Sequence, residues 1–257
     1  MSDHEIHSFP PARKLIVDAG YLGTGRHIIY GLVEVDITGF REKLDQLSTQ
    51  KGIKLSFTGF LVACLARAVA ADPRVQSYRD WRGRLIVFKD VDVVTMIESK
   101  ENKVAIPHII RKAHQRDLGD ISAEIRAVQT SPESSQQSGP LVRLAPLVPR
   151  FFRLLFFKMI KLNPQWFKNL QGTVILTSVG MFGKSGGWGV SFLPSHTLGL
   201  TVGGISAKPG VIGDRIEIRD YLNLTLAFDH DLVDGAPAAR FSRTLIETIE
   251  SGVVLDG

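Results

Sequence analysis

Cysteine is almost absent from this chain of 257 residues. The one cysteine, Cys64, lies in the apolar run at residues 60–65. It has no cysteine partner within the chain, and its apolar neighbours predict a small buried side chain, not a nucleophile. A chain without disulfides fits a reducing compartment, so we predict a cytoplasmic protein.

The first residues have none of the apolar character of a secretory signal. Residues 1–11 are polar and include two histidines. We therefore predict that residues 1–11 are disordered and are not a targeting segment. With a hydrophobic content of 44%, residues 12–257 are sufficient for one sizeable core, which predicts a single domain.

Acidic residues are missing from a long stretch of the second half. None occurs between Glu133 and Asp214, where the basic residues are Arg143, Arg150, Arg153, Lys158, Lys161, Lys168, Lys184 and Lys208. Nucleic acid is a poor candidate partner, because no helix-turn-helix, zinc or aromatic-platform pattern accompanies this charge. A phosphorylated cofactor or an anionic lipid surface fits it better. We predict no metal site.

Strand-like and helix-like segments alternate along the chain. Residues 28–37 predict a strand, after which Thr38 is expected to cap a helix. Further strands are predicted at 84–88, 91–97 and 103–110, the first two as a hairpin around Lys89 and Asp90, and helices at 57–71, 117–129 and 236–251. This mixture predicts the α+β class.

The most informative stretch is residues 222–235. Leu222, Leu224, Leu226 and Phe228 alternate with smaller or more polar residues, which predicts a strand with one buried face. His230 continues the buried parity, and Asp234 and Gly235 follow in a predicted turn. The pattern offers a base and a group that fixes it, although a lone histidine at a strand end is more often structural.

The residues of this stretch also resemble a known active-site signature. In the superfamily of chloramphenicol acetyltransferase and the dihydrolipoyl acyltransferases, the signature reads Asp-His-Arg-x-x-Asp-Gly, followed by Ala-x-x-Ala-Arg-Phe. The matching residues are Asp229, His230, Asp234, Gly235, Ala236, Ala239, Arg240 and Phe241, with Asp231 in place of the common arginine. Residues 28–38, 103–110, 172–183 and 192–205 resemble further segments of the dihydrolipoyl acyltransferases.

The resemblance implies a chloramphenicol acetyltransferase-like mixed sheet flanked by helices. It implies that His230 is the general base and that Thr177, within residues 172–183, donates to the oxyanion of the tetrahedral intermediate. Asp234 would form a salt bridge with an arginine, for which Arg13 and Arg26 are the candidates. In this superfamily the histidine and the hydroxyl come from two subunits of a trimer.

The implied activity is acyl transfer from a thioester, either acyl-CoA or a carrier-bound acyl group, to a thiol, hydroxyl or amine. Coenzyme A thioester is thus the expected substrate, with no lipoyl lysine in this chain and no metal; no CoA-binding residue is assigned. We expect a homotrimer or a higher assembly of trimers. The alternative is a non-catalytic trimeric scaffold of the same fold.

The resemblance fails at residues 139–169, which we interpret as a hydrophobic and basic insertion in the catalytic domain at 12–257. Its charges and prolines argue against a membrane span. Three interpretations remain. A basic amphipathic helix at about 149–162 would bring residues 140–168 to a membrane surface, making the protein peripheral to the membrane. The insertion would otherwise form a lid over a hydrophobic acyl channel, or an arm that packs against another subunit.

Overall fold

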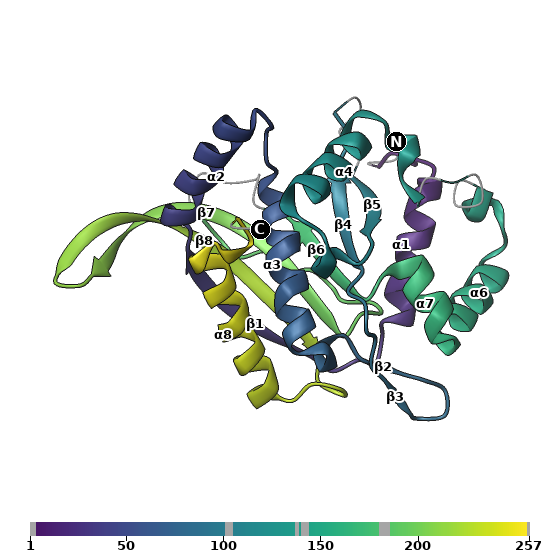
Figure 1. Ribbon diagram of the computed structural model, residues 1–257. Helices are drawn as coiled ribbons and strands as arrows, with labels where there is room; N and C mark the ends of the chain where they lie inside the picture. The colour runs from purple at the N-terminus through teal and green to yellow at the C-terminus, as the bar shows by residue number, and fades with distance from the viewer. Residues whose placement is uncertain (1–3, 101–104, 137–138, 140–143, 180–185, 256–257) are drawn as a thin grey trace.

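A mixed six-stranded sheet, ordered β1-β8-β7-β6-β4-β5, forms the centre of the molecule in a computed structural model that describes residues 4–100, 105–136, 139, 144–179 and 186–255 (Figure 1). Its strands are β1 (Ile28–Asp36), β4 (Val93–Glu98), β5 (Ala105–Ile110), β6 (Val174–Ser178), β7 (Leu198–Ile212) and β8 (Arg215–Asp229). β6 pairs in parallel with β4 and β7, and the other pairs are antiparallel. The predicted α+β class is confirmed.

One face of the sheet is covered by helices. They are α2 (Thr38–Lys51), α3 (Phe57–Ala71), α4 (Leu118–Thr130) and α8 (Gly235–Ser251). The alternating residues of β8 from Leu222 to Phe228 are buried in one hydrophobic core with α3 and α8, as their spacing predicted. The residues between them are also buried, so the prediction that one face alone is buried is wrong. Phe228 packs edge-on against Phe241 of α8, with ring centroids 5.9 Å apart. Cys64 is buried within α3, and burial raises the pKa of its thiol, which confirms the expected inert side chain.

The other face of the sheet carries a row of threonines. Thr177 of β6 lies opposite Thr201 of β7, which lies opposite Thr225 of β8. The segment before β7 covers part of this face, since the hydroxyl groups of Ser191 and Thr201 lie 2.7 Å apart. Because side chains alternate between the faces of a strand, these threonines point away from the helix-covered core.

The predicted hairpin of residues 84–88 and 91–97 is wrong. The strand β3 (Leu85–Ile86) pairs instead with β2 (Tyr78–Arg79) in a separate two-stranded sheet. Gln76 Nε2 donates to the carbonyl oxygens of Phe88 and Asp90, at 2.9 and 3.3 Å. These bonds occupy the turn and direct the chain into the central sheet, where β4 pairs with β5 and β6.

The expected helix cap at Thr38 is also in a different place. Ile37 is the N-cap residue of α2, and Thr38 is the first residue of the helix. The carboxylate of Asp36 accepts hydrogen bonds from the backbone N and the hydroxyl of Thr38, at 2.9 and 2.7 Å. An acceptor does cap this helix, but it comes from the preceding strand.

The segment predicted to be an insertion includes two α-helices, and the first of them packs on the N-terminal helix. α6 (Arg150–Leu162) contacts α1 (Pro11–Leu22). Arg153 Nε lies 2.7 Å and Arg150 Nε 3.2 Å from the carboxylate oxygens of Asp18, and both Arg153 and Asp18 are buried. None of the helices in the described part of the chain is long and apolar enough to cross a membrane.

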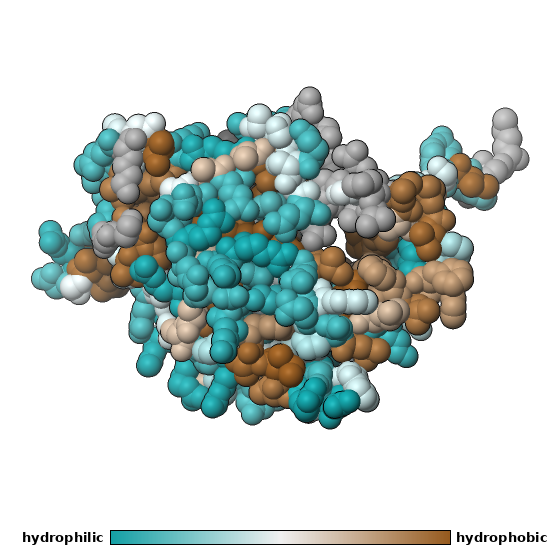
Figure 2. Space-filling model, turned by 45° about the vertical axis from the view of Figure 1, so that its right-hand side comes forward, coloured by the Kyte–Doolittle hydropathy of each residue, from teal (hydrophilic) through white to brown (hydrophobic). Residues whose placement is uncertain are grey.

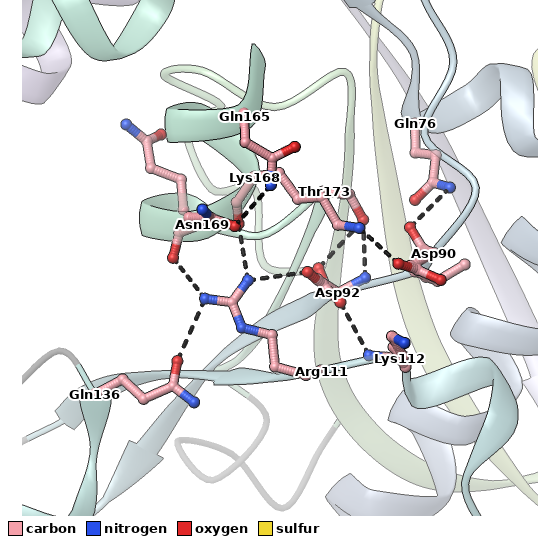
Figure 3. Close-up of polar contacts among 12 residues, drawn as sticks. Gln76, Asp90, Asp92, Arg111, Lys112, Gln136, Gln165, Lys168, Asn169 and Thr173 are labelled. Carbon is pink, nitrogen blue, oxygen red and sulfur yellow. Dashed lines mark hydrogen bonds and ion pairs between the residues drawn. The ribbon is translucent and has the colours of Figure 1, made fainter. Parts of the chain in front are cut away.

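A second set of contacts fixes α7 (Pro164–Gln171), which follows α6, to the central sheet (Figure 3). Arg111 Nη1 donates to Asp92 Oδ2 and to the carbonyl oxygen of Lys168, each at 2.9 Å, and Nη2 donates to the carbonyl oxygen of Asn169. Lys168 Nζ lies 2.8 Å from Asp90 Oδ2. A guanidinium thus satisfies two carbonyl groups near the end of α7 and anchors this helix to the sheet.

Candidate active site

His230 is the first residue after β8, at the start of a turn. Its backbone N donates to the carbonyl oxygen of His27 at 2.7 Å, which continues the pairing of β1 with β8. The imidazole is exposed. The expectation of a buried, inward-facing ring is therefore wrong for the single chain, because the strand ends one residue earlier, at Asp229.

The turn is fixed by Asp229. Arg26 donates to Asp229 Oδ2 through Nε at 3.0 Å and through Nη2, and the exposed fractions of the two side chains are 10% and 8%. Asp229 Oδ1 accepts from the backbone N of Asp231 at 3.2 Å, and the Asp229 carbonyl oxygen accepts from the backbone N of Leu232 and Val233. A buried ion pair thus holds the backbone on both sides of His230.

Replacing Arg26 tests the strength of this support. The substitution Arg26→Leu is expected to lower the free energy of unfolding by about 3 kcal/mol, because it leaves the Asp229 carboxylate buried without a counter-ion. Denaturant unfolding measures this change. The matched control is Arg41→Leu, whose exposed ion pair with Asp220 is worth less than about 1 kcal/mol. Equal losses from the two substitutions would contradict the assigned role of Arg26.

Asp234 does not form the expected salt bridge within the chain. It is exposed at the N-cap position of α8, and its carbonyl oxygen accepts from the backbone N of Ala238 at 3.0 Å. Its carboxylate has no hydrogen-bond or ion-pair partner among the described residues. Arg26 is committed to Asp229, and Arg13 is exposed on α1. A carboxylate at the N-cap position stabilises the N-terminus of a helix, and it does so whether or not it also acts in catalysis.

Thr177 lies in the middle of the sheet on β6 and is half-buried. Its hydroxyl makes no hydrogen bond within the part of the chain that the structure describes. Gly180 to Gly183, the end of the motif that predicted its role, lie outside the described residues. The donor expected from Thr177 thus lies on the face of the sheet opposite α3 and α8.

His230 and Thr177 of one chain are far apart. Thr177, Thr201 and Thr225 are directly opposite one another on three adjacent strands, and His230 is five residues beyond Thr225. At about 3.3 Å per residue and about 4.8 Å between strands, the backbone positions of His230 and Thr177 are about 19 Å apart. A base and an oxyanion donor must both lie within hydrogen-bonding distance of the reacting atoms. The two residues of one chain therefore cannot act on one substrate.

A pocket of about 470 Å³ opens beside the His230 turn. Its walls come from five segments, and its charged lining residues are Arg26, Arg79, Asp80, Lys158, Lys161, Asp229 and Asp231. Each carboxylate has a partner of its own: Asp80 binds Arg84, Asp229 binds Arg26, and Asp231 binds His27. Because the walls are so distant in sequence, no local pattern indicates this pocket.

The unpaired charges in this pocket are positive. Arg79, Lys158 and Lys161 have no ion-pair partner among the described residues. Lys161 is exposed, but partial burial of its amine in the pocket and the Arg26 charge lower its pKa, while the Asp229 charge acts in the opposite direction. The pocket therefore offers a cationic surface next to the candidate base. No group of three or more possible metal ligands occurs among the described residues.

His196, to which the sequence assigned no role, is a structural histidine. It is buried, and its Nε2 lies 2.8 Å from the carbonyl oxygen of Gln171 at the end of α7. Burial lowers its pKa from 6.5 to about 4, against the opposing effect of the Gln171 carbonyl. The neutral ring thus joins the end of α7 to the segment before β7.

This burial predicts an acid-sensitive fold. Between pH 6.5 and about 4 the unfolded chain binds a proton at His196 and the folded chain does not, so stability falls as the pH is lowered through this window. The loss is about 3 kcal/mol at full extent. The substitution His196→Gln keeps a hydrogen-bond donor and removes the titrating group. The free energy of unfolding of this variant should therefore fall by about 3 kcal/mol less than that of the unaltered protein when the pH is lowered. Denaturant unfolding at pH 7 and pH 4 measures the difference; equal acid losses in both proteins would contradict it.

One family of known proteins matches most of this sequence. The profile of the family described as 2-oxoacid dehydrogenases acyltransferase (catalytic domain) matches residues 28–138 and 158–255. The chain belongs to this family. The matched residues include His230, Asp234 and Thr177, whereas residues 139–157, with the first half of α6, are not matched.

Curated relatives of this acyltransferase-family chain are longer proteins. It is 26% identical over 206 residues to the dihydrolipoyllysine-residue acetyltransferase component of the pyruvate dehydrogenase complex of Rickettsia bellii, covering 80% of this chain and 42% of that protein. It is 27% identical over 221 residues to the dihydrolipoyllysine-residue succinyltransferase component of the 2-oxoglutarate dehydrogenase complex of Bartonella vinsonii, covering 84% and 46%. The chain thus spans less than half the length of these relatives.

Solved structures confirm the fold. The dihydrolipoamide acetyltransferase of Azotobacter vinelandii aligns with a TM-score of 0.72 at 19% identity, covering 98% of this chain and 94% of that one. A chloramphenicol acetyltransferase aligns with a TM-score of 0.54 at 13% identity, covering 98% of both chains. The predicted chloramphenicol acetyltransferase-like sheet flanked by helices is therefore correct.

Proposed function

We propose that this acyltransferase-family chain moves an acyl group from a thioester, either acyl-CoA or a carrier-bound acyl group, to a thiol, hydroxyl or amine, in a site formed by two copies of the chain. The observation that supports this most strongly is the separation of about 19 Å between His230 and Thr177 of one chain. His230 follows β8 in a turn fixed by Asp229, and Thr177 lies within β6; neither side chain has a hydrogen-bond or ion-pair partner among the described residues. A second copy of the chain would bring the two together.

The proposed reaction needs no covalent enzyme intermediate. His230 removes the proton of the acceptor as its sulfur, oxygen or nitrogen attacks the thioester carbonyl carbon. The hydroxyl of Thr177 from the neighbouring copy donates to the carbonyl oxygen as it becomes negative. The tetrahedral intermediate then collapses, the carbon–sulfur bond breaks, and the thiolate takes the proton from His230. One bond to the carbonyl carbon forms and the carbon–sulfur bond breaks, the acceptor proton ends on the leaving thiol, and no oxidant or reductant is needed.

The assembly we propose is a homotrimer, alone or within a larger assembly. The chain aligns with a structure described as the cubic core of the pyruvate dehydrogenase multienzyme complex, at 21% identity and a TM-score of 0.70, covering 98% of this chain and 95% of that one. Three copies around one axis would give three equivalent contacts between the His230 turn of one chain and the Thr177 face of the next.

A panel assay tests the proposed function. The purified assembly is supplied with acyl-CoAs of different chain length and with dihydrolipoamide, an alcohol or an amine, and free CoA and acylated acceptor are both measured. We expect turnover with at least one pair and its loss in His230→Ala. Absence of turnover across the whole panel, from an intact assembly, would instead favour a non-catalytic scaffold.

A further inference from the structure

The helix α6 carries three distinct faces. At about 100° of rotation per residue, the buried Arg153 and Ile160 lie within one narrow arc. Arg153 pairs with Asp18 of α1, and Ile160 packs with Tyr78, Phe88 and Phe167. This arc and the Arg111 contacts of α7 fix which side of the helix faces the protein.

The opposite side of α6 is apolar and exposed. We name it the α6 outer face: Phe151, Phe152, Leu155, Phe156, Met159 and Leu162, with exposed fractions of 70, 58, 46, 52, 45 and 42%. These residues span about 140° of the helix circumference without a polar side chain among them. Figure 2 shows apolar side chains gathered over the end of the molecule that carries α6 in Figure 1. A continuous apolar surface of this kind indicates a binding surface.

A basic flank borders the α6 outer face. Lys158 and Lys161 are exposed on the side of α6 that lines the pocket beside the His230 turn. α6 contains no acidic residue, and its other two cations, Arg150 and Arg153, share the single carboxylate of Asp18, so one positive charge remains there as well. The surface therefore combines large apolar side chains with unpaired positive charge, which is the composition of helices that lie in the headgroup layer of anionic membranes.

We propose that α6 docks the protein on an anionic membrane surface, with the α6 outer face among the acyl chains and Lys158 and Lys161 at the lipid phosphates. The orientation follows from the anchored side of the helix, since Arg153 and Ile160 hold that side against the protein; of the α6 outer face, Leu162 alone lines the pocket beside the His230 turn in the described part of the chain. The α6 outer face is thus less suited to a lid over an acyl channel, because its six side chains are exposed. Docking would set the pocket beside the His230 turn at the level of the headgroups.

Flotation of the whole assembly with vesicles tests this proposal. We expect it to bind vesicles of phosphatidylcholine with phosphatidylserine more tightly than vesicles of phosphatidylcholine alone, and to lose part of that preference in high salt. The substitutions Lys158→Gln and Lys161→Gln together should weaken binding to the anionic vesicles about 30-fold. Binding to neutral vesicles should not change.

The apolar contribution is tested by Phe152→Ser with Phe156→Ser, which should weaken the partition into both kinds of vesicle by at least about 100-fold. The matched control is Ile216→Ser with Ile218→Ser, two isoleucines of 76 and 81% exposure on the β7–β8 arm that extends beyond the body of the molecule in Figure 1. This control should bind vesicles as the unaltered protein does.

Two results would overturn membrane docking. One is a failure of the flotation test, either because the protein does not bind anionic vesicles or because the phenylalanine substitutions leave its binding unchanged. The other is a smaller assembly of the phenylalanine variant in light scattering, which would place the α6 outer face between copies of the chain. The phenylalanine variant should retain His230-dependent turnover of soluble acyl-CoA without vesicles, so failure of docking and failure of the proposed acyltransferase function are distinguishable.

Discussion

The substitution His230→Ala is expected to lower kcat by a factor of about 10² to 10⁴, the usual contribution of a positioned general base. His230 is exposed at the end of β8, while the turn around it is fixed by the Arg26–Asp229 ion pair. Because its side chain supports none of the packing, its removal should leave the fold and the assembly intact. Steady-state turnover with the best acyl donor and acceptor measures the effect.

His27 supplies the matched control for this substitution. It is an exposed imidazole directly before β1, and its carbonyl oxygen accepts a hydrogen bond from the backbone N of His230. Its Nδ1 lies 2.9 Å from Asp231 Oδ1, outside the proposed proton transfer. The substitution His27→Ala should change kcat by less than about threefold. An equally small effect of His230→Ala would exclude His230 as the base.

The substitution Thr177→Ala is expected to lower kcat by a factor of about 10² to 10³, with little change in KM, because the lost hydrogen bond forms only as charge develops on the oxygen. The loss corresponds to about 3 to 4 kcal/mol of barrier. Thr177→Ser should retain most of the activity, since it keeps the hydroxyl. Initial rates over a range of donor concentrations separate kcat from KM.

Ser178 is the matched control for Thr177. It is the next residue of β6, is exposed, and points to the opposite face of the sheet. The substitution Ser178→Ala should leave kcat within about threefold of the unaltered protein. Two results would show that the hydroxyl does not stabilise the transition state. One is a kcat of Thr177→Ala within the same threefold range, and the other is an equally large loss of kcat in Thr177→Ser.

The elements that the sequence predicted best are helices whose apolar residues recur at helical spacing, because this spacing is visible in the local sequence. The helix at 57–71 is α3 (Phe57–Ala71), and the basic amphipathic segment at 149–162 is α6 (Arg150–Leu162). The hairpin at Lys89 was mispredicted because a distant side chain, Gln76, occupies the turn. Local propensity contains no information about such a partner.

The site was predictable only in part for the same reason. The signature around them identified His230, Asp234 and Thr177 as candidates. In the structure His230 follows β8 and Thr177 lies on β6. The partner of Arg26 was mispredicted, although Asp229 directly precedes the histidine, because only the pairing of β1 with β8 brings Arg26 beside it. The cationic pocket has no sequence signal, since its walls come together only in the folded chain.

Mixed assemblies of two inactive variants provide the sharpest test of a shared active site. When His230→Ala and Thr177→Ala chains are produced together in equal amounts, about one quarter of the sites between copies receive an intact histidine from one chain and an intact threonine from the next. We therefore expect the mixture to recover about one quarter of the unaltered activity, although each variant alone is inactive. Activity no higher than that of the separate variants, from assemblies proven to be mixed, would contradict a site built from two copies.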